Sequence, residues 1–566
     1  MPKDLMTKQG ELLRYVGGMP WNVYPRPQMR RENWLNLNGM WEFTVSNFPT
    51  LPEDYDKKIR VPFCPESILS GLRRHFSEGR FLYYRHTVQV PQAWRSGRVL
   101  LHIGAADQVA KVYANDELLD VHTGGYESFT VDVTDALYSD SDELELVICC
   151  MDNLQDRSFP YGKQTLTRGG MWYTPVSGIW QTVWLENVPE RYIQKLNIEN
   201  RGYGVTISTV PAMDGKITIP ELGEFPLQNG SVTITPENPH LWSPEDPFLY
   251  DFTIETDTDK VTSYFAIRSL EIKKVDGFQR LCLNGKPYFF HGLLDQGYWP
   301  DGLFTPAAAE CYAEDILAMK RLGFNTLRKH IKVEAEQFYY DCDRLGMIVF
   351  QDMVNNGEYN FFRDTVLPTI GIQKLNDHNF HNDPTTRQRF LDSMTTTVNQ
   401  LKNHPCICYW TIFNEGWGQF DSDHVYGLLK ELDDTRFIDT TSGWFRRNKS
   451  DVDSRHVYFK PVKLTAGDKP LVLSEFGGYS FKPKDHVFNT EQTYGYRKFE
   501  DAAAYGDAVE KLYLEQIVPA YEKGLCAAIY TQVSDVEDET NGILSYDRKV
   551  TKVDEKKMRS IAEKLK

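Results

Sequence analysis

From about residue 276 onward the sequence alternates strand-like and helix-like segments, and this alternation constrains the fold most strongly. The apolar runs have the length of buried strands, and amphipathic stretches with helical periodicity separate them. Strands are expected at 288–292, 324–328, 347–352, 408–414, 436–442, 454–459, 471–475 and 525–532. Strands that alternate with helices favour a parallel sheet, and eight of them predict a C-terminal (β/α)8 TIM barrel over residues 276–566.

Two helix starts in this part of the chain are marked by capping residues. Thr305 and Pro306 supply an N-cap and a first-turn proline for a helix that Gly323 ends. Asp383 and Pro384 mark the start of a later helix in the same way. An irregular insertion at 355–380 precedes that helix.

The first 275 residues have a different pattern, in which short β-type runs and turn residues recur without helical periodicity. The runs 98–104 and 109–117 are typical of a β-sandwich or jelly roll. Residues 1–190 are therefore expected to form an N-terminal jelly-roll β-sandwich. Residues 191–275, with a turn-rich stretch at 236–247, have the length and strand density of an immunoglobulin-like β-sandwich.

Composition excludes several classes of function. The formal net charge of -16 repels nucleic acids and anionic membrane surfaces, so neither is an expected partner. The nine cysteines are scattered, mostly in apolar runs and without a CxxC pair, which predicts reduced core thiols and no metal site. The first twenty residues lack a signal-peptide core and no run of eighteen apolar residues occurs, so a cytoplasmic protein is expected.

Two of the expected strands lead into a glutamate that is closely followed by glycine and an aromatic residue. Glu415 ends the fourth strand of the expected barrel, and Glu475 ends the seventh. Barrel strands open on one face, where barrel enzymes assemble their active sites. A single glutamate at a strand end is usually solvated or paired with a cation, but two that face one cleft indicate glycosidic bond cleavage.

Taken together, several motifs resemble glycoside hydrolase family 2, which contains β-galactosidases, β-glucuronidases and β-mannosidases. The resemblance rests on Asn414-Glu415 and on the segments 178–180, 241–250, 283–287, 322–328 and 474–477. It spans nearly the whole chain and implies a sugar-binding-like jelly roll, an immunoglobulin-like domain and a catalytic barrel. It also implies that Glu415 is the acid/base and Glu475 the nucleophile of a glycosidase.

A pair of this kind hydrolyses with retention and stands ~5–5.5 Å apart, against ~6.5–9.5 Å in an inverting enzyme. Glu415 must be protonated at first, and ionised Glu475 together with burial beside Trp410 or Trp417 would raise its pKa. Two-carboxylate catalysis needs no cofactor. No catalytic metal is expected, while a structural or sugar-bridging cation stays open.

Ten further positions are predicted to contact the substrate. Asn414 is expected to bind the sugar 2-hydroxyl, Arg328 to orient the Glu475 carboxylate, and Tyr458 to donate to it. A turn residue and a structural ion pair are the alternatives for Asn414 and Arg328. The other candidates lie on or near strand ends: His330, His456, Asp295, Asp352, Trp417, Trp444 and Tyr530. For these seven the alternatives are structural histidines, solvated aspartates and packed aromatic rings.

The sequence departs from the family pattern at two strand ends. His330 stands one position earlier than in the Arg-x-Ser-His motif of many members, and the third strand ends in Gln351-Asp352 where Asp-Glu is common. An Asn-x-Lys motif of the kind that β-glucuronidases use is not found, which disfavours that specificity.

The first expectation for the activity is therefore that of an exo-acting β-galactosidase-like enzyme. The long C-terminal domains of the largest β-galactosidases are also not found, so a compact enzyme of this type is expected. The alternatives are a β-glucuronidase, a β-mannosidase, an α-L-arabinosidase, or a catalytically silent carbohydrate-binding protein. A carbohydrate is the expected partner, and the resemblance leaves a homo-oligomer open.

Overall fold

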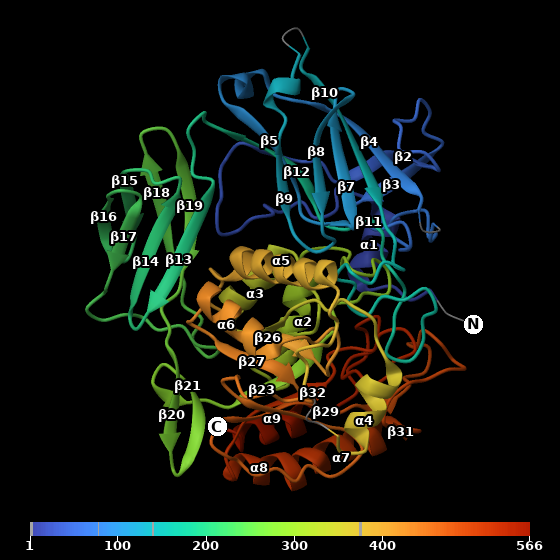
Figure 1. Ribbon diagram of the computed structural model, residues 1–566, viewed down its shortest axis with the longest axis vertical. Helices are drawn as coiled ribbons and strands as arrows, with labels where there is room; N and C mark the ends of the chain where they lie inside the picture. The colour runs from blue at the N-terminus through green and yellow to red at the C-terminus, as the bar shows by residue number, and fades with distance from the viewer. Residues whose placement is uncertain (1–3, 77–78, 139–140, 373–375) are drawn as a thin grey trace.

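A computed structural model describes residues 4–76, 79–138, 141–372 and 376–566. The first three residues, on which part of the signal-peptide prediction rests, lie outside these ranges, as does a piece of the insertion predicted at 355–380. Figure 1 shows a β-sandwich above a barrel, with a second sandwich beside them. The predicted fold class, two β-sandwiches followed by a TIM barrel, is confirmed.

The first sandwich consists of two antiparallel sheets. A four-stranded sheet, β1-β12-β5-β9, faces a six-stranded sheet, β3-β2-β4-β10-β7-β8, and β11 pairs with β6 at the edge. Trp41, Phe43 and Leu101 belong to the apolar core between the sheets. The helix α1 (Lys8–Val16) precedes these strands: β1 (Trp34–Asn36), β2 (Gly39–Ser46), β3 (Lys57–Val61), β4 (Phe81–Gln89), β5 (Arg98–Ile103), β6 (Ala106–Asp107), β7 (Val109–Ala114), β8 (Glu117–Thr123), β9 (Phe129–Asp132), β10 (Glu143–Met151), β11 (Gly178–Ile179) and β12 (Val183–Val188).

The second sandwich packs a three-stranded sheet, β13-β14-β17, against a four-stranded sheet, β16-β15-β18-β19. Alternate residues of its first strand, Leu196 and Ile198, are buried, as the period of two in a half-buried strand requires. Its strands are β13 (Lys195–Arg201), β14 (Gly204–Val210), β15 (Gly215–Ile219), β16 (Gly223–Leu227), β17 (Ser231–Ile234), β18 (Tyr250–Thr256) and β19 (Lys260–Phe265).

A small sheet follows the second sandwich and leads into the barrel. It consists of β20 (Leu270–Val275), β21 (Phe278–Leu283) and β22 (Lys286–Pro287). Its first two strands lie on either side of the domain limit that the sequence places after residue 275. The limits 1–190, 191–275 and 276–566 stay a prediction.

The C-terminal part is a barrel of eight parallel strands in the order β27-β26-β25-β24-β23-β32-β29-β28. β27 and β28 lie near each other without forming a ladder in the described residues, so the barrel is nearly closed. The predicted strands are present within a few residues of their expected ends: β23 (Phe290–Asp295), β24 (Thr326–Lys329), β25 (Ile348–Asp352), β26 (Ile407–Asn414), β27 (Phe437–Ser442), β28 (Asp453–Val457), β29 (Leu471–Gly477) and β32 (Leu525–Thr531).

Helices surround these strands, and one of them joins the barrel to the first sandwich. They are α2 (Glu310–Arg321), α3 (Glu336–Leu345), α4 (Leu367–Thr369), α5 (Pro384–Leu401), α6 (Ser422–Leu432), α7 (Ala502–Leu512), α8 (Val518–Glu522) and α9 (Glu555–Glu563), with a short parallel pair β30 (Tyr479–Phe481) and β31 (Arg497–Phe499) after β29. α5 lies between barrel and sandwich (Figure 1), and its Gln400 accepts hydrogen bonds from Ser128 of the sandwich. As predicted, Asp383 caps α5 by accepting from the backbone N–H of Thr386 at 2.7 Å.

The start of α2 differs from the prediction. The helix begins at Glu310, and Thr305 is not its N-cap. Instead the Thr305 hydroxyl donates to the carbonyl of Trp180, and the Trp21 indole donates to the carbonyl of Pro306 at 2.8 Å. These bonds hold residues 305 and 306 against the first sandwich, so tertiary contacts override the local capping signal.

All nine cysteines are free and buried, as predicted for core thiols. Within residues 4–76, 79–138, 141–372 and 376–566, no helix combines the length and apolar composition needed to span a membrane.

Candidate active site

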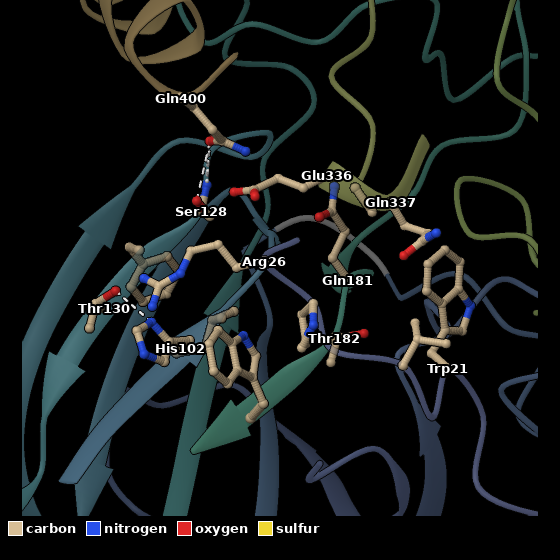
Figure 2. A pocket seen from close by; sticks show the side chains of 17 residues that line it. Trp21, Arg26, His102, Ser128, Thr130, Gln181, Thr182, Glu336, Gln337 and Gln400 are labelled. Atoms are coloured by element: carbon tan, nitrogen blue, oxygen red, sulfur yellow. Dashed lines mark hydrogen bonds between the residues drawn. The ribbon is translucent and has the colours of Figure 1, made fainter. Parts of the chain in front are cut away.

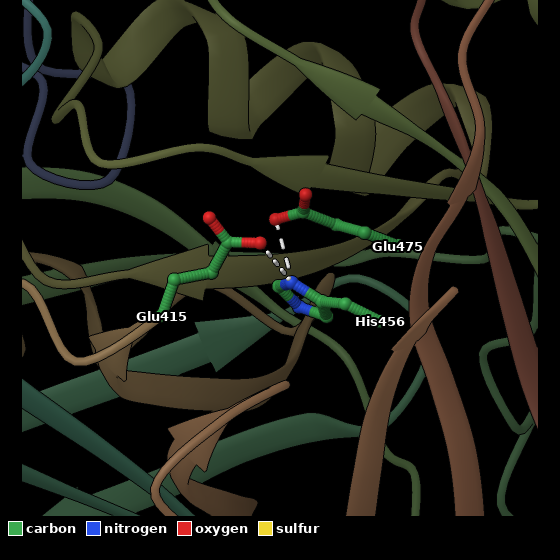
Figure 3. A group of neighbouring side chains, drawn as sticks. All are labelled: Glu415, His456 and Glu475. Atoms are coloured by element: carbon green, nitrogen blue, oxygen red, sulfur yellow. Dashed lines mark hydrogen bonds and ion pairs between the residues drawn. The ribbon is translucent and has the colours of Figure 1, made fainter. Parts of the chain in front are cut away.

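Glu415 and Glu475 lie beside each other at the carboxyl ends of β26 and β29 (Figure 3). His456, near the end of β28, lies with them: its Nδ1 is 2.7 Å from Oε1 of Glu415, and its Nε2 is 3.6 Å from Oε1 of Glu475. One carboxylate oxygen of each glutamate and a ring nitrogen of the histidine lie within 4.8 Å of one another. An upper limit of 4.8 Å between these atoms fits the ~5–5.5 Å of a retaining pair and lies below the ~6.5–9.5 Å of an inverting pair.

The chain turns sharply at the end of β26. Glu415 has a φ of 52°, in the left-handed region that non-glycine residues rarely adopt, and its N–H donates to the carbonyl of Ser442 at 3.0 Å. Gly416 follows with a φ of 80°, and a Cβ there would lie 2.4 Å from the ring of Phe445. A backbone conformation that costs ~1–3 kcal/mol persists only where its surroundings enforce it, and such residues cluster at functional sites.

The Glu475 carboxylate receives a hydrogen bond on each oxygen. Nη1 of Arg328 donates to Oε1 at 3.0 Å, and the Tyr458 hydroxyl donates to Oε2. Arg328 is fully buried and also donates to Asp352 at 3.0 Å and to Oδ1 of Asn414 at 2.9 Å. The guanidinium at the end of β24 thus connects the ends of β25, β26 and β29.

The two glutamates have opposite pKa shifts. Burial raises the pKa of Glu415, and the negative charge of Glu475 raises it further against the opposing effect of His456. Burial also acts to raise the pKa of Glu475, but the electrostatic effects of His456 and Arg328 outweigh it and lower that pKa to about 2. The pair is therefore arranged with one carboxyl favoured in its protonated form and the other ionised.

His330 and Asp352 form a buried pair next to Arg328. Nδ1 of His330 lies 2.8 Å from Oδ2 of Asp352, and burial lowers the pKa of His330 to about 4, so the imidazole is neutral near pH 7. Asp352 is only 1% exposed, and the alternative of a solvated aspartate is wrong for it. Its carboxylate holds the side chains of Arg328 and His330.

Asp295 lies in a separate ion pair. Its carboxylate accepts from Nζ of Lys329 at 2.7 Å, and the same ammonium donates to Glu334 at 2.9 Å. Asp295 is therefore a paired residue rather than a solvated one.

The three aromatic candidates differ in position. Trp417 is buried and stacks on Trp172 with ring centres 5.4 Å apart, and the half-buried Trp444 lies 6.3 Å from the ring of His456. Tyr530 is fully buried, and a Cβ on Gly477 would lie 2.3 Å from its ring. Tyr530 thus packs beneath the turn that follows Glu475.

Of the two tryptophans expected beside Glu415, Trp410 or Trp417, the first points elsewhere. The Trp410 indole donates to Oδ2 of Asp433 at 2.8 Å, and Asp433 lies just beyond α6, away from the ends of the strands that carry the glutamates. Alternate residues of a strand point to opposite faces of the sheet, and the sequence alone does not show which face Trp410 takes.

Sequence reasoning missed residues that come from other parts of the chain. Lys163 and Trp172 belong to residues 152–177 of the first sandwich, which connect β10 to β11 and reach the barrel site. Tyr496 stacks on Tyr458 with ring centres 4.1 Å apart. The available signal was the length of the connection 152–177, because loops this long in compact domains are usually functional.

Glu415, His456 and Glu475 could also hold a metal ion, since their ligand atoms are close together. However, the guanidinium of Arg328 already lies 3.0 Å from Glu475 and opposes a second positive charge there. The charge arrangement fits a carboxylate pair better than a metal centre.

A cavity of about 80 Å³ lies between the first sandwich and the barrel (Figure 2), and neither Glu415 nor Glu475 lines it. Trp21, His102, Gln181 and Gln337 line it, and Glu336 is the one acidic residue among its lining side chains. A cavity with a single carboxylate cannot perform two-carboxylate chemistry.

Two family profiles match the chain. "Glycosyl hydrolases family 2" matches residues 190–268, and "Glycosyl hydrolases family 2, TIM barrel domain" matches residues 273–465. The chain belongs to glycoside hydrolase family 2.

Individual relatives of this family 2 chain are distant. A β-galactosidase of Thermoanaerobacter pseudethanolicus is 24% identical over 439 residues, which cover 70% of this chain and 53% of the relative. A β-glucuronidase of Felis catus is 24% identical over 456 residues, which cover 70% of this chain and 65% of the relative. The chain thus spans less than two thirds of the length of either protein.

A solved structure shares the whole architecture. The β-D-glucuronidase structure from Dictyoglomus thermophilum superposes with a TM-score of 0.72 at 18% identity and covers 96% of this chain and 98% of its own. At this identity the likeness shows the fold of the family 2 chain and no more.

Proposed function

We propose that the protein is a retaining, exo-acting glycoside hydrolase that cleaves a terminal β-linked sugar, with Glu475 as nucleophile and Glu415 as acid/base. The observation that carries the proposal is the closeness of the two carboxylates, because one oxygen of Glu415 lies within 4.8 Å of one oxygen of Glu475. Their opposite pKa shifts support the same assignment. Family membership supports a glycosidase.

In the first step Glu475 attacks the anomeric carbon while Glu415 gives its proton to the glycosidic oxygen. The C–O bond breaks, its electron pair stays with the leaving oxygen, and an ester forms between the sugar and Glu475. Glu475 is ready to attack because Arg328 and Tyr458 hold its carboxylate ionised. The buried, protonated Glu415 supplies the proton.

In the second step a water molecule replaces the aglycone. The ester carries no charge, so the negative charge that had raised the pKa of Glu415 is gone, and Glu415 can accept a proton from the water. The oxygen of that water attacks the anomeric carbon and releases Glu475. Two inversions give net retention.

Three neighbouring side chains are proposed to position these groups. Arg328 orients Glu475 and also fixes Oδ1 of Asn414, which leaves the Asn414 amide N–H groups to donate to the sugar 2-hydroxyl. His456, whose Nδ1 lies 2.7 Å from Oε1 of Glu415, fixes the direction of that carboxyl group.

For the sugar, we propose a β-glucuronide in place of the β-galactoside first expected from the sequence. One curated relative and the solved structure reported above are β-glucuronidases, while the other relative is a β-galactosidase. The activities given for these proteins favour a β-glucuronide over a β-galactoside as the substrate.

A catalytically silent carbohydrate-binding protein is disfavoured by the site. Burying two carboxylates side by side costs free energy, and a protein without catalysis gains nothing from it. Cytoplasmic location and a homo-oligomer stay predictions, the second of which gel filtration with light scattering tests.

Hydrolysis of a panel of nitrophenyl glycosides tests the function: β-glucuronide, β-galactoside, β-glucoside, β-mannoside and α-L-arabinoside. We expect turnover of the β-glucuronide above the others, with the β-anomer of the free sugar appearing first by NMR. First appearance of the α-anomer would contradict retention, and preference for the β-galactoside would restore the first expectation for the sugar.

A further inference from the structure

Lys163 is a buried cation that the first sandwich places at the barrel site. It lies in the connection 152–177, and the residue is only 7% exposed. Its ammonium is 6.0 Å from the ring centre of Trp417 and 5.5 Å from that of Tyr173. Trp417 is two residues beyond Glu415, so the ammonium faces the candidate active site.

The positive charge of Lys163 acts on the pKa values of two groups that follow barrel strands. It lowers the pKa of Glu415 after β26 and that of His330 after β24. The ammonium therefore lies near groups of the candidate active site, although its backbone belongs to another domain.

Lys163 differs from the other buried lysines in its partners. Lys329 and Lys332 each donate to Glu334 at 2.9 Å, and Lys552 donates to Asp535 at 2.5 Å. In the part of the chain that the structure describes, no carboxylate lies within ion-pair distance of the Lys163 ammonium. The neighbours of this ammonium are the rings of Tyr173 and Trp417. Charged groups of largely buried residues are normally paired, so this ammonium is available to an anion that binds in the site.

We propose that Lys163 recognises a carboxylate of the substrate. The inference rests on the proposed glycosidase function and adds its substrate class, a glycoside that carries an acidic group near the bond to be cleaved. A substrate carboxylate completes the ion pair in a site that excludes water, where the pair is strong. A neutral sugar leaves the ammonium without an anionic partner, and the site discriminates against it.

The carboxylate has two sources, the C-6 group of a uronic acid ring or an acidic aglycone. Nitrophenyl β-D-glucuronide and nitrophenyl β-D-glucoside differ only at C-6 and test the first source. Phenyl and 4-carboxyphenyl β-D-glucosides differ only in the aglycone and test the second.

The experiment compares the wild type with Lys163→Met, which keeps the length of the side chain and removes its charge. Lys163→Arg restores the charge, and Lys58→Met, at an exposed position of β3 in the same sandwich, is the matched control. We expect Lys163→Met to lower kcat/KM for the acidic substrate on the order of 10²-fold more than for its neutral counterpart. Lys163→Arg should recover part of the preference, and Lys58→Met should match the wild type.

Each outcome decides the inference. A selective loss on the glucuronide supports it with the sugar as source, and a selective loss on the carboxyphenyl glucoside supports it with the aglycone as source. Equal losses on acidic and neutral substrates would mean that Lys163 only adjusts Glu415 or the fold, and would overturn it. So would an unchanged preference.

Binding separates this inference from the proposed function. Calorimetry with free glucuronate and with glucose measures recognition without turnover. If the wild type hydrolyses no glycoside, the proposed function fails, but glucuronate binding that is lost in Lys163→Met would still support the role of Lys163. Equal binding of glucuronate by the wild type and Lys163→Met would contradict the uronic acid ring as the source of the carboxylate and leave the aglycone series to decide the role of Lys163.

Discussion

The guanidinium of Arg328 donates to Oε1 of Glu475 at 3.0 Å, and both side chains are buried. This ion pair connects the second and seventh strands of the barrel. It keeps the proposed nucleophile ionised, and the same guanidinium is bound by Asp352 on the third strand.

Replacement of Arg328 by methionine should destabilise the protein and abolish turnover. The change leaves the carboxylates of Glu475 and Asp352 buried without their cation, which costs ~3–5 kcal/mol in comparable buried networks. Urea unfolding at pH 7 measures the loss, and kcat/KM measures the activity. Arg328→Lys keeps the charge and should lose less stability. A methionine variant as stable as the wild type would show that the ion pair does not hold the site.

In a profile of kcat/KM against pH, the acid-side fall should lie below the usual pKa range of a glutamate, and the alkaline-side fall should be set by Glu415. Glu475 has a pKa lowered to about 2, so it stays ionised as the pH falls through 4, whereas the raised pKa of Glu415 keeps it protonated above 4.5. A profile of kcat/KM against pH checks both limbs, and Glu415→Gln should remove the alkaline one. An alkaline limb that persists in this variant would assign the acid to another group.

The lowered pKa of Glu475 also makes the stability of the folded protein depend on pH. The depressed pKa of Glu475 stabilises the folded state above the unfolded value of ~4.3, and this contribution is lost as the pH falls toward 2. Thermal unfolding between pH 6 and pH 3 should show a smaller acid-induced loss for Glu475→Gln than for the wild type. An equal loss in both would contradict the shift.

Gly477→Ala should impair catalysis by moving the turn that follows Glu475. Gly477 has a φ of 84°, and a Cβ there would lie 2.3 Å from the ring of Tyr530. We expect kcat to fall at least ~10-fold, because a displacement near 1 Å at the nucleophile is costly. Gly427→Ala in α6 is the control, since its added Cβ meets nothing within 4 Å. Wild-type kcat in Gly477→Ala would show that this turn tolerates movement.

Trp172→Ala should loosen the contact between the first sandwich and the barrel. Its ring stacks on Trp417 with an interplanar angle of 23°, and such pairs contribute ~0.5–1.5 kcal/mol beyond area burial. We expect KM to rise for every substrate of the panel. Trp34→Ala removes an aromatic contact with Trp184 inside the same sandwich and should leave KM unchanged. Equal KM values in both variants would place Trp172 outside the site.

The sequence predicted the barrel and the position of the glutamates well, because both are encoded locally. An apolar strand that ends in Glu415 or Glu475 determines its own length, and the carboxyl ends of all strands in a parallel barrel open on the same face. Thr305 shows where local signals fail, since its hydroxyl bonds to Trp180 of another domain instead of capping α2.

The residues that were missed come from connections whose path no local pattern encodes. Lys163 lies more than 250 positions before Glu415, and only the packing of the first sandwich on the barrel brings them together. The sequence disfavoured a β-glucuronidase because an Asn-x-Lys motif was not found. A cation supplied from another domain weakens that argument.

The most direct test of the account is covalent trapping of the nucleophile. Incubation with a 2-deoxy-2-fluoro-β-D-glucuronosyl fluoride slows release of the sugar, and mass spectrometry of the digested protein locates the added mass. We expect one fluorosugar per chain on the peptide that contains Glu475, and none in Glu475→Gln. A label on any other residue, or the same label in Glu475→Gln, would contradict the proposed mechanism.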